Sequence, residues 1–202
     1  MLVYRDFAVQ DEHHTYLPGP FLTSTQATPG GTGLRELRAR VRPAMEGLCA
    51  RAAETVNLMV RVGTEVRFLD SAESSQILHV GDRRGTILPA RLASGGKVLL
   101  ATLTPDQLWD LYPDLADPER AALARELDEV REILGYALNV EGTEQGVSAI
   151  GAALRNGSGS AVAALSISAP SARFGTDRVA AFAKELRRAV AEAEQALAGF
   201  PD

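Results

Sequence analysis

Two short groups of residues have types and spacing suited to binding a small molecule. Ser94-Gly95-Gly96-Lys97 opens an apolar segment, and a serine–glycine turn at a helix start presents backbone N–H groups to an anion. Ser166 and Ser168 lie two residues apart in an apolar run, so their hydroxyls point to the same side of a strand. Hydroxyls on a buried strand need partners, which a ligand could supply. The residues alone leave two simpler interpretations open: an ordinary helix capped by Ser94, and a strand end in solvent.

The residue patterns of common catalytic and metal sites do not occur in the sequence. Gly96-Lys97 differs from a phosphate-binding P-loop, because Arg91 stands where the first glycine is needed and Val98 follows the lysine. Ser94 lacks the preceding glycine of a nucleophile elbow and has no well-placed histidine as a base. The candidate metal ligands show no ligand spacing: His13, His14, His79 and Cys49. We therefore expect no catalytic residue, no metal and no cofactor.

The composition is that of a globular protein. The chain has 202 residues, 46% hydrophobic and 23% charged, enough for one large domain or one domain with an appendage. Its 21 Lys and Arg against 26 Asp and Glu give a net charge of −5 without a dense basic run, so we expect no DNA binding by this chain alone. No segment is apolar enough to span a bilayer, the N-terminus has no secretory signal, and the single cysteine fits a cytoplasmic location.

The first 33 residues differ from the rest of the chain. Residues 3–9 and 15–17 are predicted to form two short strands around a polar turn, and Pro18-Gly19-Pro20 then breaks the chain. Residues 28–33 are typical of a linker. About 20 residues cannot bury a core of their own. The expected organisation is the end of a preceding region at 1–22, a linker at 23–33 and one domain at 34–202.

Apolar periodicity predicts the elements of the main domain. Residues 34–53 have a helical stripe, in which Pro43 should cause a kink or a break, and residues 56–68 alternate as a hairpin around Gly63. Thr104 and Asp117 precede prolines and are predicted helix N-caps. The other predicted elements are a strand at 76–80, a helix from 94, strands at 136–140, 147–154 and 161–168, and a helix from 176. This order indicates an α+β fold with a mainly antiparallel sheet.

Three stretches of the chain follow one another in a recognisable order. Residues 85–101 contain the Gly96-Lys97 pair, residues 135–150 contain Gly146, and residues 164–173 end at Arg173. Together they resemble the effector-binding domain of the isocitrate lyase regulator (IclR) family of bacterial transcription factors. The resemblance implies a profilin-like or GAF-like fold, which is a curved, mainly antiparallel, six-stranded sheet flanked by helices.

The resemblance also implies partners and a site. Residues 15–20 resemble the segment after the family's winged helix-turn-helix, so residues 1–22 would be a remnant of its wing region. The domain would bind a small organic, often carboxylic, acid, form a homodimer or homotetramer, and reach DNA only through the missing winged helix-turn-helix. The implied ligand-binding positions are backbone N–H groups of Ser94 and Gly95, hydroxyls of Ser166 and Ser168, the family's aspartate and cysteine positions Asn139 and Ala149, and an apolar wall of Ile77 and Val80.

We therefore interpret the chain as a ligand-sensing domain without catalysis, with no membrane partner. Arg91 stands where the family commonly has a histidine, and it would add an anion partner if it faced the pocket. A surface arginine is the other interpretation. Two different functions stay open: a small α/β enzyme acting on a small acid through Ser94 or Asn139, and an oligomerisation module without a pocket. No histidine lies in the three stretches, which counts against the enzyme.

Overall fold

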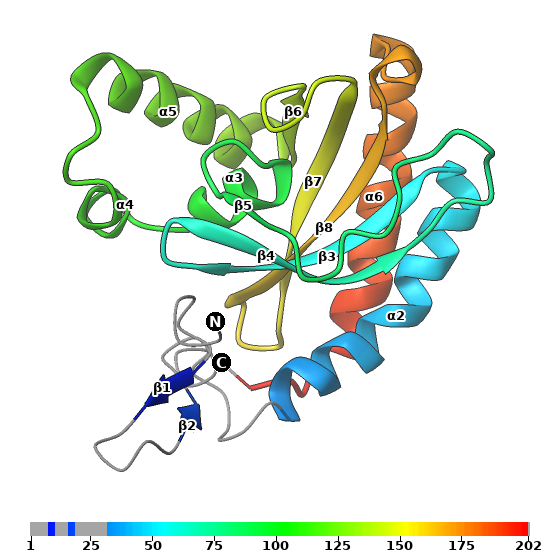
Figure 1. Cartoon of the computed structure of the whole chain (residues 1–202), viewed down its shortest axis with the longest axis horizontal. Coiled ribbons are helices and arrows are strands. Elements are labelled where there is room, and N and C mark those ends of the chain that lie inside the picture. Colours follow the sequence, from blue (N-terminus) through cyan, green and yellow to red (C-terminus); the bar gives the residue numbers. More distant parts are fainter. Residues whose placement is uncertain (1–7, 11–15, 19–31, 202) are drawn as a thin grey trace.

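A six-stranded sheet with helices on both faces forms the main body of the protein (Figure 1). The computed structural model describes residues 8–10, 16–18 and 32–201. The strands of this sheet are β3 (Thr55–Val62), β4 (Glu65–Ala72), β5 (Ile87–Pro89), β6 (Ala137–Val140), β7 (Val147–Arg155) and β8 (Ala161–Pro170). Their order is β5-β4-β3-β8-β7-β6, and every neighbouring pair is antiparallel. The predicted α+β class and six-stranded antiparallel sheet are confirmed.

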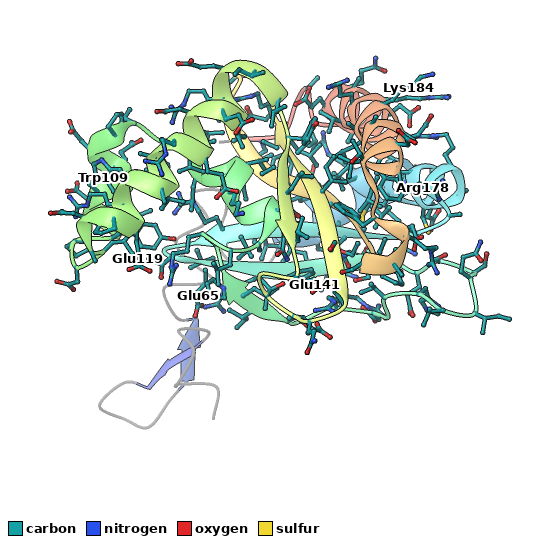
Figure 2. All side chains as sticks on the ribbon, turned by 90° about the horizontal axis from the view of Figure 1, so that it is seen from above. Glu65, Trp109, Glu119, Glu141, Arg178 and Lys184 are labelled. Carbon is teal, nitrogen blue, oxygen red and sulfur yellow. The ribbon has the colours of Figure 1, made fainter. Side chains whose placement is uncertain are left out.

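The helices divide between the two faces of the sheet. They are α2 (Thr32–Ala52), α3 (Ser94–Leu100), α4 (Pro105–Leu111), α5 (Asp117–Glu129) and α6 (Thr176–Ala196). Met45 of α2 and Phe182 of α6 belong to the apolar core on one face, whereas Leu100 of α3 and Leu127 of α5 join Met59 on the other. Trp109 of α4 and Lys184 of α6 mark these two sides in Figure 2. The candidate site lies on the α3 side.

Two predictions about helices need correction. α2 continues through Pro43 without a break. Its flanking residues Val41 and Met45 are fully buried, so packing on the sheet holds the helix although one backbone donor is missing. The N-cap of α5 is Ala116 rather than Asp117, which lies in the first turn, where the helix dipole favours a carboxylate. The prediction for Thr104 is confirmed, since it forms a capping box with Gln107.

The predicted strand at 76–80 is wrong. Residues 73–86 form an irregular connection between β4 and β5, and the third strand is β5. Side chains donate hydrogen bonds to two carbonyl groups of this connection, so these two carbonyls do not pair with a strand. Thr55 Oγ1 donates to Val80 O at 2.5 Å, and Arg173 Nη2 donates to Leu78 O at 2.8 Å. The order helix, three strands, helices, three strands, helix nevertheless holds.

The N-terminal residues are described only in part. β1 (Ala8–Gln10) and β2 (Tyr16–Pro18) pair antiparallel, in agreement with the predicted hairpin. Residues 3–7 and 15 of the predicted strands, the two histidines of the turn and most of the predicted linker lie outside the described residues.

The start of α3 lies directly on β7, and glycine makes this possible. A Cβ atom on Gly151 would stand 2.8 Å from the backbone nitrogen of Gly95, and one on Gly96 would stand 2.2 Å from the carbonyl oxygen of Ala90. Lys97 Nζ then donates to Glu126 Oε1 at 2.5 Å and to Leu138 O at 2.9 Å, which ties α3 to α5 and β6. Packing and this tether therefore account for the Gly96-Lys97 pair.

The helix that contains α5 ends in a π-helical turn. Val130–Leu134 forms this turn, the N–H of Gly135 donates to Val130 O at 2.9 Å, and Gly135 has a φ of 67°. The predicted stop at Gly135 is confirmed, because a left-handed residue ends a helix and glycine adopts that conformation without strain. β6 begins two residues later.

A buried ion pair fixes the end of β8 to the start of β3. Glu54 is 1% exposed and accepts from Arg173 at 2.6 Å and 2.8 Å, one bond to each carboxylate oxygen. Hydrogen bonding to Glu54 raises the pKa of Arg173. The same guanidinium reaches Leu78 O, so this pair also anchors the connection at 73–86.

Loss of Arg173 should therefore destabilise the fold. Arg173→Met leaves a buried carboxylate unpaired and should lower the free energy of unfolding by about 3 kcal/mol, whereas Glu54→Leu with Arg173→Met should recover most of that loss. Arg188→Met, which removes an exposed arginine paired with Glu192, is the control and should change stability by less than about 1 kcal/mol. Urea unfolding measures all three, and a single variant as stable as the double variant would contradict the role of the pair.

Candidate functional site

A small cavity lies between the start of α3 and the sheet. Its volume for a water-sized sphere is about 20 Å³, room for about one water molecule. The lining residues are Met59, Phe68, Arg83, Leu88, Ala93, Ser94, Asn139, Thr143, Val147, Ala149, Ser166 and Ser168. Five of the eight positions that the sequence singled out therefore surround one space.

Strand register explains why these positions meet. Asn139 of β6 pairs with Ala149 of β7, and Ala149 pairs with Ser168 of β8, so these three form one row across the sheet. Ser166 lies two residues from Ser168 on the same face, opposite Gly151. Ser94 comes from α3, above this floor, and is 2% exposed. The short segments that resembled the family thus supply the polar groups on two sides of the cavity.

The three serines are in different hydrogen-bonding states. Ser168 Oγ accepts from Asn57 Nδ2 at 3.0 Å, and Asn57 Oδ1 accepts from the hydroxyl of Ser71 at 2.7 Å. The hydroxyls of Ser94 and Ser166 form no hydrogen bond within the part of the chain that the structure describes. Both residues are at most 2% exposed. The two hydroxyls therefore lack a partner among the described residues, but neither oxygen is fully enclosed, so both are accessible from the cavity that they line.

The side-chain amide of Asn139 is engaged in the neighbouring turn. Its Oδ1 accepts from the N–H of Gly142 at 2.8 Å, and its Nδ2 donates to Thr143 Oγ1 at 2.7 Å. A Cβ atom on Gly142 would stand 2.9 Å from Asn139 Oδ1. Gly142 therefore leaves the space that the side-chain amide of Asn139 occupies.

The other predicted positions lie away from the cavity lining. Ile77 is fully exposed in the connection at 73–86, and Val80 is buried but does not line the cavity. Gly95 packs against Met59, whose Cε would stand 2.2 Å from an added Cβ. Arg91 reaches toward Glu119 of α5 at 3.9 Å.

Most residues of the cavity walls could not be predicted from the sequence. The apolar wall consists of Met59, Phe68, Leu88 and Val147. Met59 and Phe68 belong to the alternating patterns of β3 and β4, so the face of the sheet on which they lie could be predicted from the sequence. Their closeness to α3 could not be predicted in this way. Arg83 also lines the cavity, and its only sequence signal was the basic pair Arg83-Arg84 before a glycine.

Charges beside Arg83 are held in place locally. Asp82 accepts from the side chain and the backbone N–H of Arg84, and these hydrogen bonds lower the pKa of Asp82 to about 2. Asp82 and Arg84 therefore satisfy each other, while Arg83 pairs with Glu144 at 2.5 Å. Among the described residues, no three His, Cys, Asp or Glu side chains cluster as a metal site would require. None of the described helices is both long and apolar enough to cross a membrane.

Comparison with known proteins identifies the class of protein. Residues 32–194 match the family described as bacterial transcriptional regulator IclR, C-terminal domain, so the chain belongs to this family. The HTH-type transcriptional repressor AllR of Escherichia coli K12 is 30% identical over 152 residues, which is 71% of this chain and 56% of that protein. AllR of Klebsiella pneumoniae is 31% identical over 144 residues, 67% of this chain and 53% of that protein. The chain thus spans little more than half the length of these relatives, both of which are transcriptional repressors.

Solved structures share the fold. The Thermotoga maritima IclR structure has a TM-score of 0.73 at 24% identity, covering 97% of this chain and 81% of that one. The C-terminal domain of Escherichia coli KdgR has a TM-score of 0.70 at 24% identity, covering 80% of this chain and 98% of that one. The family implied by the three sequence stretches is confirmed, and the enzyme interpretation is not supported.

The contact between α3 and β7 gives a test of how the cavity is built. Gly151→Ala drives a methyl group into the backbone of α3 and should lower the free energy of unfolding by about 1–3 kcal/mol. Gly95→Ala should cost less, because its closest neighbour is the flexible end of Met59. Gly81→Ala, at an exposed position where an added Cβ meets open space, is the control. Urea unfolding of the three variants measures the order, and a larger loss for Gly95→Ala than for Gly151→Ala would contradict this packing.

Proposed function

We propose that this chain is the effector-sensing part of a bacterial transcriptional regulator and that the cavity below α3 binds a small organic acid. The observation that carries this proposal is the pair of hydroxyls of Ser94 and Ser166, which line the cavity and have no hydrogen-bond partner among the described residues. Hydroxyl groups in a nearly buried site usually have a hydrogen-bond partner from protein, water or a ligand. A ligand with two or more acceptor oxygens would satisfy both.

Backbone groups support the same ligand class. The N-cap of α3 is Ala93, which has no side chain that could accept a hydrogen bond, so the first N–H groups of this helix have no side-chain acceptor. Ser168 can still donate its proton, because its oxygen accepts from Asn57. The hydroxyl protons of Ser94, Ser166 and Ser168 can all be donated into this space, which favours a ligand with acceptor oxygens.

The small volume supports a sensing role. A cavity of about 20 Å³ cannot hold an organic acid without outward movement of its walls. Binding would then favour a more open form over the compact one, and a ligand shifts such an equilibrium by the difference between its affinities for the two forms. This difference is the free energy that a regulator can transmit to DNA binding.

DNA recognition belongs, in this proposal, to a winged helix-turn-helix of the complete regulator and not to residues 34–202. The net charge of −5 supports this division, since DNA-binding surfaces are usually basic. The assignment of residues 1–22 to the wing region and 23–33 to a linker remains a prediction. So does assembly into a homodimer or homotetramer.

Removal of one hydroxyl tests the ligand site. Ser166→Ala should weaken binding of an acid by at least about tenfold, because a hydrogen bond to a charged ligand contributes about 1.5–3 kcal/mol. Stability should hardly change, since this hydroxyl has no partner to lose. Ser168→Ala should weaken binding as well and also cost about 1 kcal/mol of stability, because it strands the amide of Asn57.

The measurement is a thermal-shift screen of two- to seven-carbon carboxylic acids, followed by calorimetric titration of those that raise the melting temperature. Ser160→Ala, which removes a hydroxyl from the turn between β7 and β8, is the matched control. Unchanged affinity in Ser166→Ala would show that the site lies elsewhere.

Self-association is a separate prediction. The apolar face of α2 is used within the chain, where Leu37, Met45 and Leu48 are buried, so a contact through α2 would have to use its charged outer face. Such a contact should weaken as salt screens it. Light scattering at about 10–100 µM, a range suited to weak dimers, should give a dimer or tetramer at low ionic strength. A monomer throughout this range would contradict self-association.

A further inference from the structure

One charged side chain lines the cavity and has no role in the ligand contacts proposed so far. Among the described lining residues only Arg83 carries a formal charge. Its side chain is 17% exposed, although arginine is usually a surface residue. It comes from the connection at 73–86 and not from the strand that carries Ser166 and Ser168.

A chain of hydrogen bonds fixes Arg83 relative to that floor. The backbone N–H of Arg83 donates to Ser71 Oγ at 3.1 Å, Ser71 donates to Asn57 at 2.7 Å, and Asn57 donates to Ser168 at 3.0 Å. Three consecutive bonds therefore connect the backbone of this connection to a hydroxyl of the cavity. The backbone of Arg83 is thus fixed before a ligand arrives, which reduces the ordering cost of a contact with that ligand.

The present partner of Arg83 is a carboxylate from the same chain. Arg83 Nη2 lies 2.5 Å from Glu144 Oε2. The two side chains differ in environment, since that of Glu144 is 52% exposed and that of Arg83 is 17% exposed. Glu144 can therefore turn into water at little cost. Arg83 has little water around it, so the same movement would leave its guanidinium without a partner. A buried charge left without a partner is strongly unfavourable.

We propose that Arg83 selects a carboxylate ligand and that Glu144 occupies the place of the ligand's carboxylate until the ligand binds. This inference rests on the proposed function, because it concerns the same cavity. A carboxylate ligand replaces one anion by another at the guanidinium, and it can do so with two parallel hydrogen bonds. An uncharged ligand of the same shape has two options. It either displaces Glu144 and leaves Arg83 without an anionic partner, or it binds while the Arg83–Glu144 ion pair stays intact. The pair thus rejects neutral compounds as well as binding anions.

The pair also links two segments that border the cavity, since Arg83 and Thr143 both line it. It joins the connection at 73–86 to the turn at 141–146, and the amide of Asn139 fixes the backbone of that turn through Gly142 and Thr143. The carboxylate of Glu144 is therefore the movable part. Exchange of Glu144 for a ligand carboxylate releases the link between the two segments at the moment when the larger space is needed.

A purely structural ion pair makes different predictions. If Arg83 and Glu144 only stabilise the fold, removal of either charge should have the same small effect on stability and no effect on which ligands bind. If Glu144 competes with the ligand, the two substitutions should change ligand affinity in opposite directions.

The experiment is calorimetric titration with two pairs of probes, propionate with propionamide and benzoate with benzamide. The native protein should bind each acid at least about tenfold more tightly than its amide. Arg83→Gln should lose this preference, and Arg83→Lys should retain part of it, because the charge stays and the two-pronged geometry is lost. Glu144→Gln should bind the acids about two- to fivefold more tightly than the native protein, the factor that corresponds to a weak ion pair.

Controls and contrary outcomes separate this inference from the proposed function. Arg188→Gln and Glu192→Gln remove the same charges from a pair on the surface of α6 and should leave every affinity unchanged. Weaker or unchanged acid binding by Glu144→Gln, or a preference for acids that survives in Arg83→Gln, would overturn the inference. Amides that bind as tightly as the acids would also overturn the inference. If Ser166→Ala weakened the binding of these amides, the proposed site would still stand. Absence of binding for all four probes, in the native protein and in Glu144→Gln, would overturn the role of Arg83, and failure of the wider acid screen would overturn the site itself.

Discussion

The close approach of α3 to β7 is the constraint on which the cavity depends. No Cβ atom separates the two elements, because Gly151 faces the backbone of Ser94 and Gly95. A separation larger by one methyl group would move the hydroxyl of Ser94 away from the row that carries Ser166. Lys97 secures the arrangement from the far side through Glu126 and Leu138. The glycine-lysine sequence that looks at first like a nucleotide-binding motif is therefore a packing and anchoring device in this fold.

The parts of the fold that were predictable have local causes. Alternation in β3, β4, β7 and β8 and the stops at glycine depend on neighbours in sequence, so they could be read without a structure. The serine pair at 166 and 168 was readable for the same reason, since a strand has a period of two. Register then brought Asn139 and Ala149 to the same row without further assumptions.

The parts that were not predictable depend on contacts between distant segments. The connection at 73–86 has the apolar residues of a strand, but Thr55 and Arg173 bind its carbonyls, and neither partner is visible from local sequence. The same holds for Arg83, whose position follows from Ser71, and for Gly95, which is required by Met59. The family resemblance supplied an apolar wall at Ile77 and Val80, whereas the sheet itself supplies this wall through Met59 and Phe68.

The π-helical turn at Val130–Leu134 has a consequence for how this sequence can change in length. A π turn contains one residue more than an α turn closed by the same number of hydrogen bonds, so a single deletion there can be absorbed by a return to regular α-helix. A deletion between Gly135 and Asn139 cannot be absorbed in this way, because every later residue of β6 would move to the other face of the sheet. The side-chain amide of Asn139 would then no longer bind the turn at Gly142. A single deletion in this stretch is therefore tolerated before the left-handed glycine, whereas one after it displaces the side chains of β6.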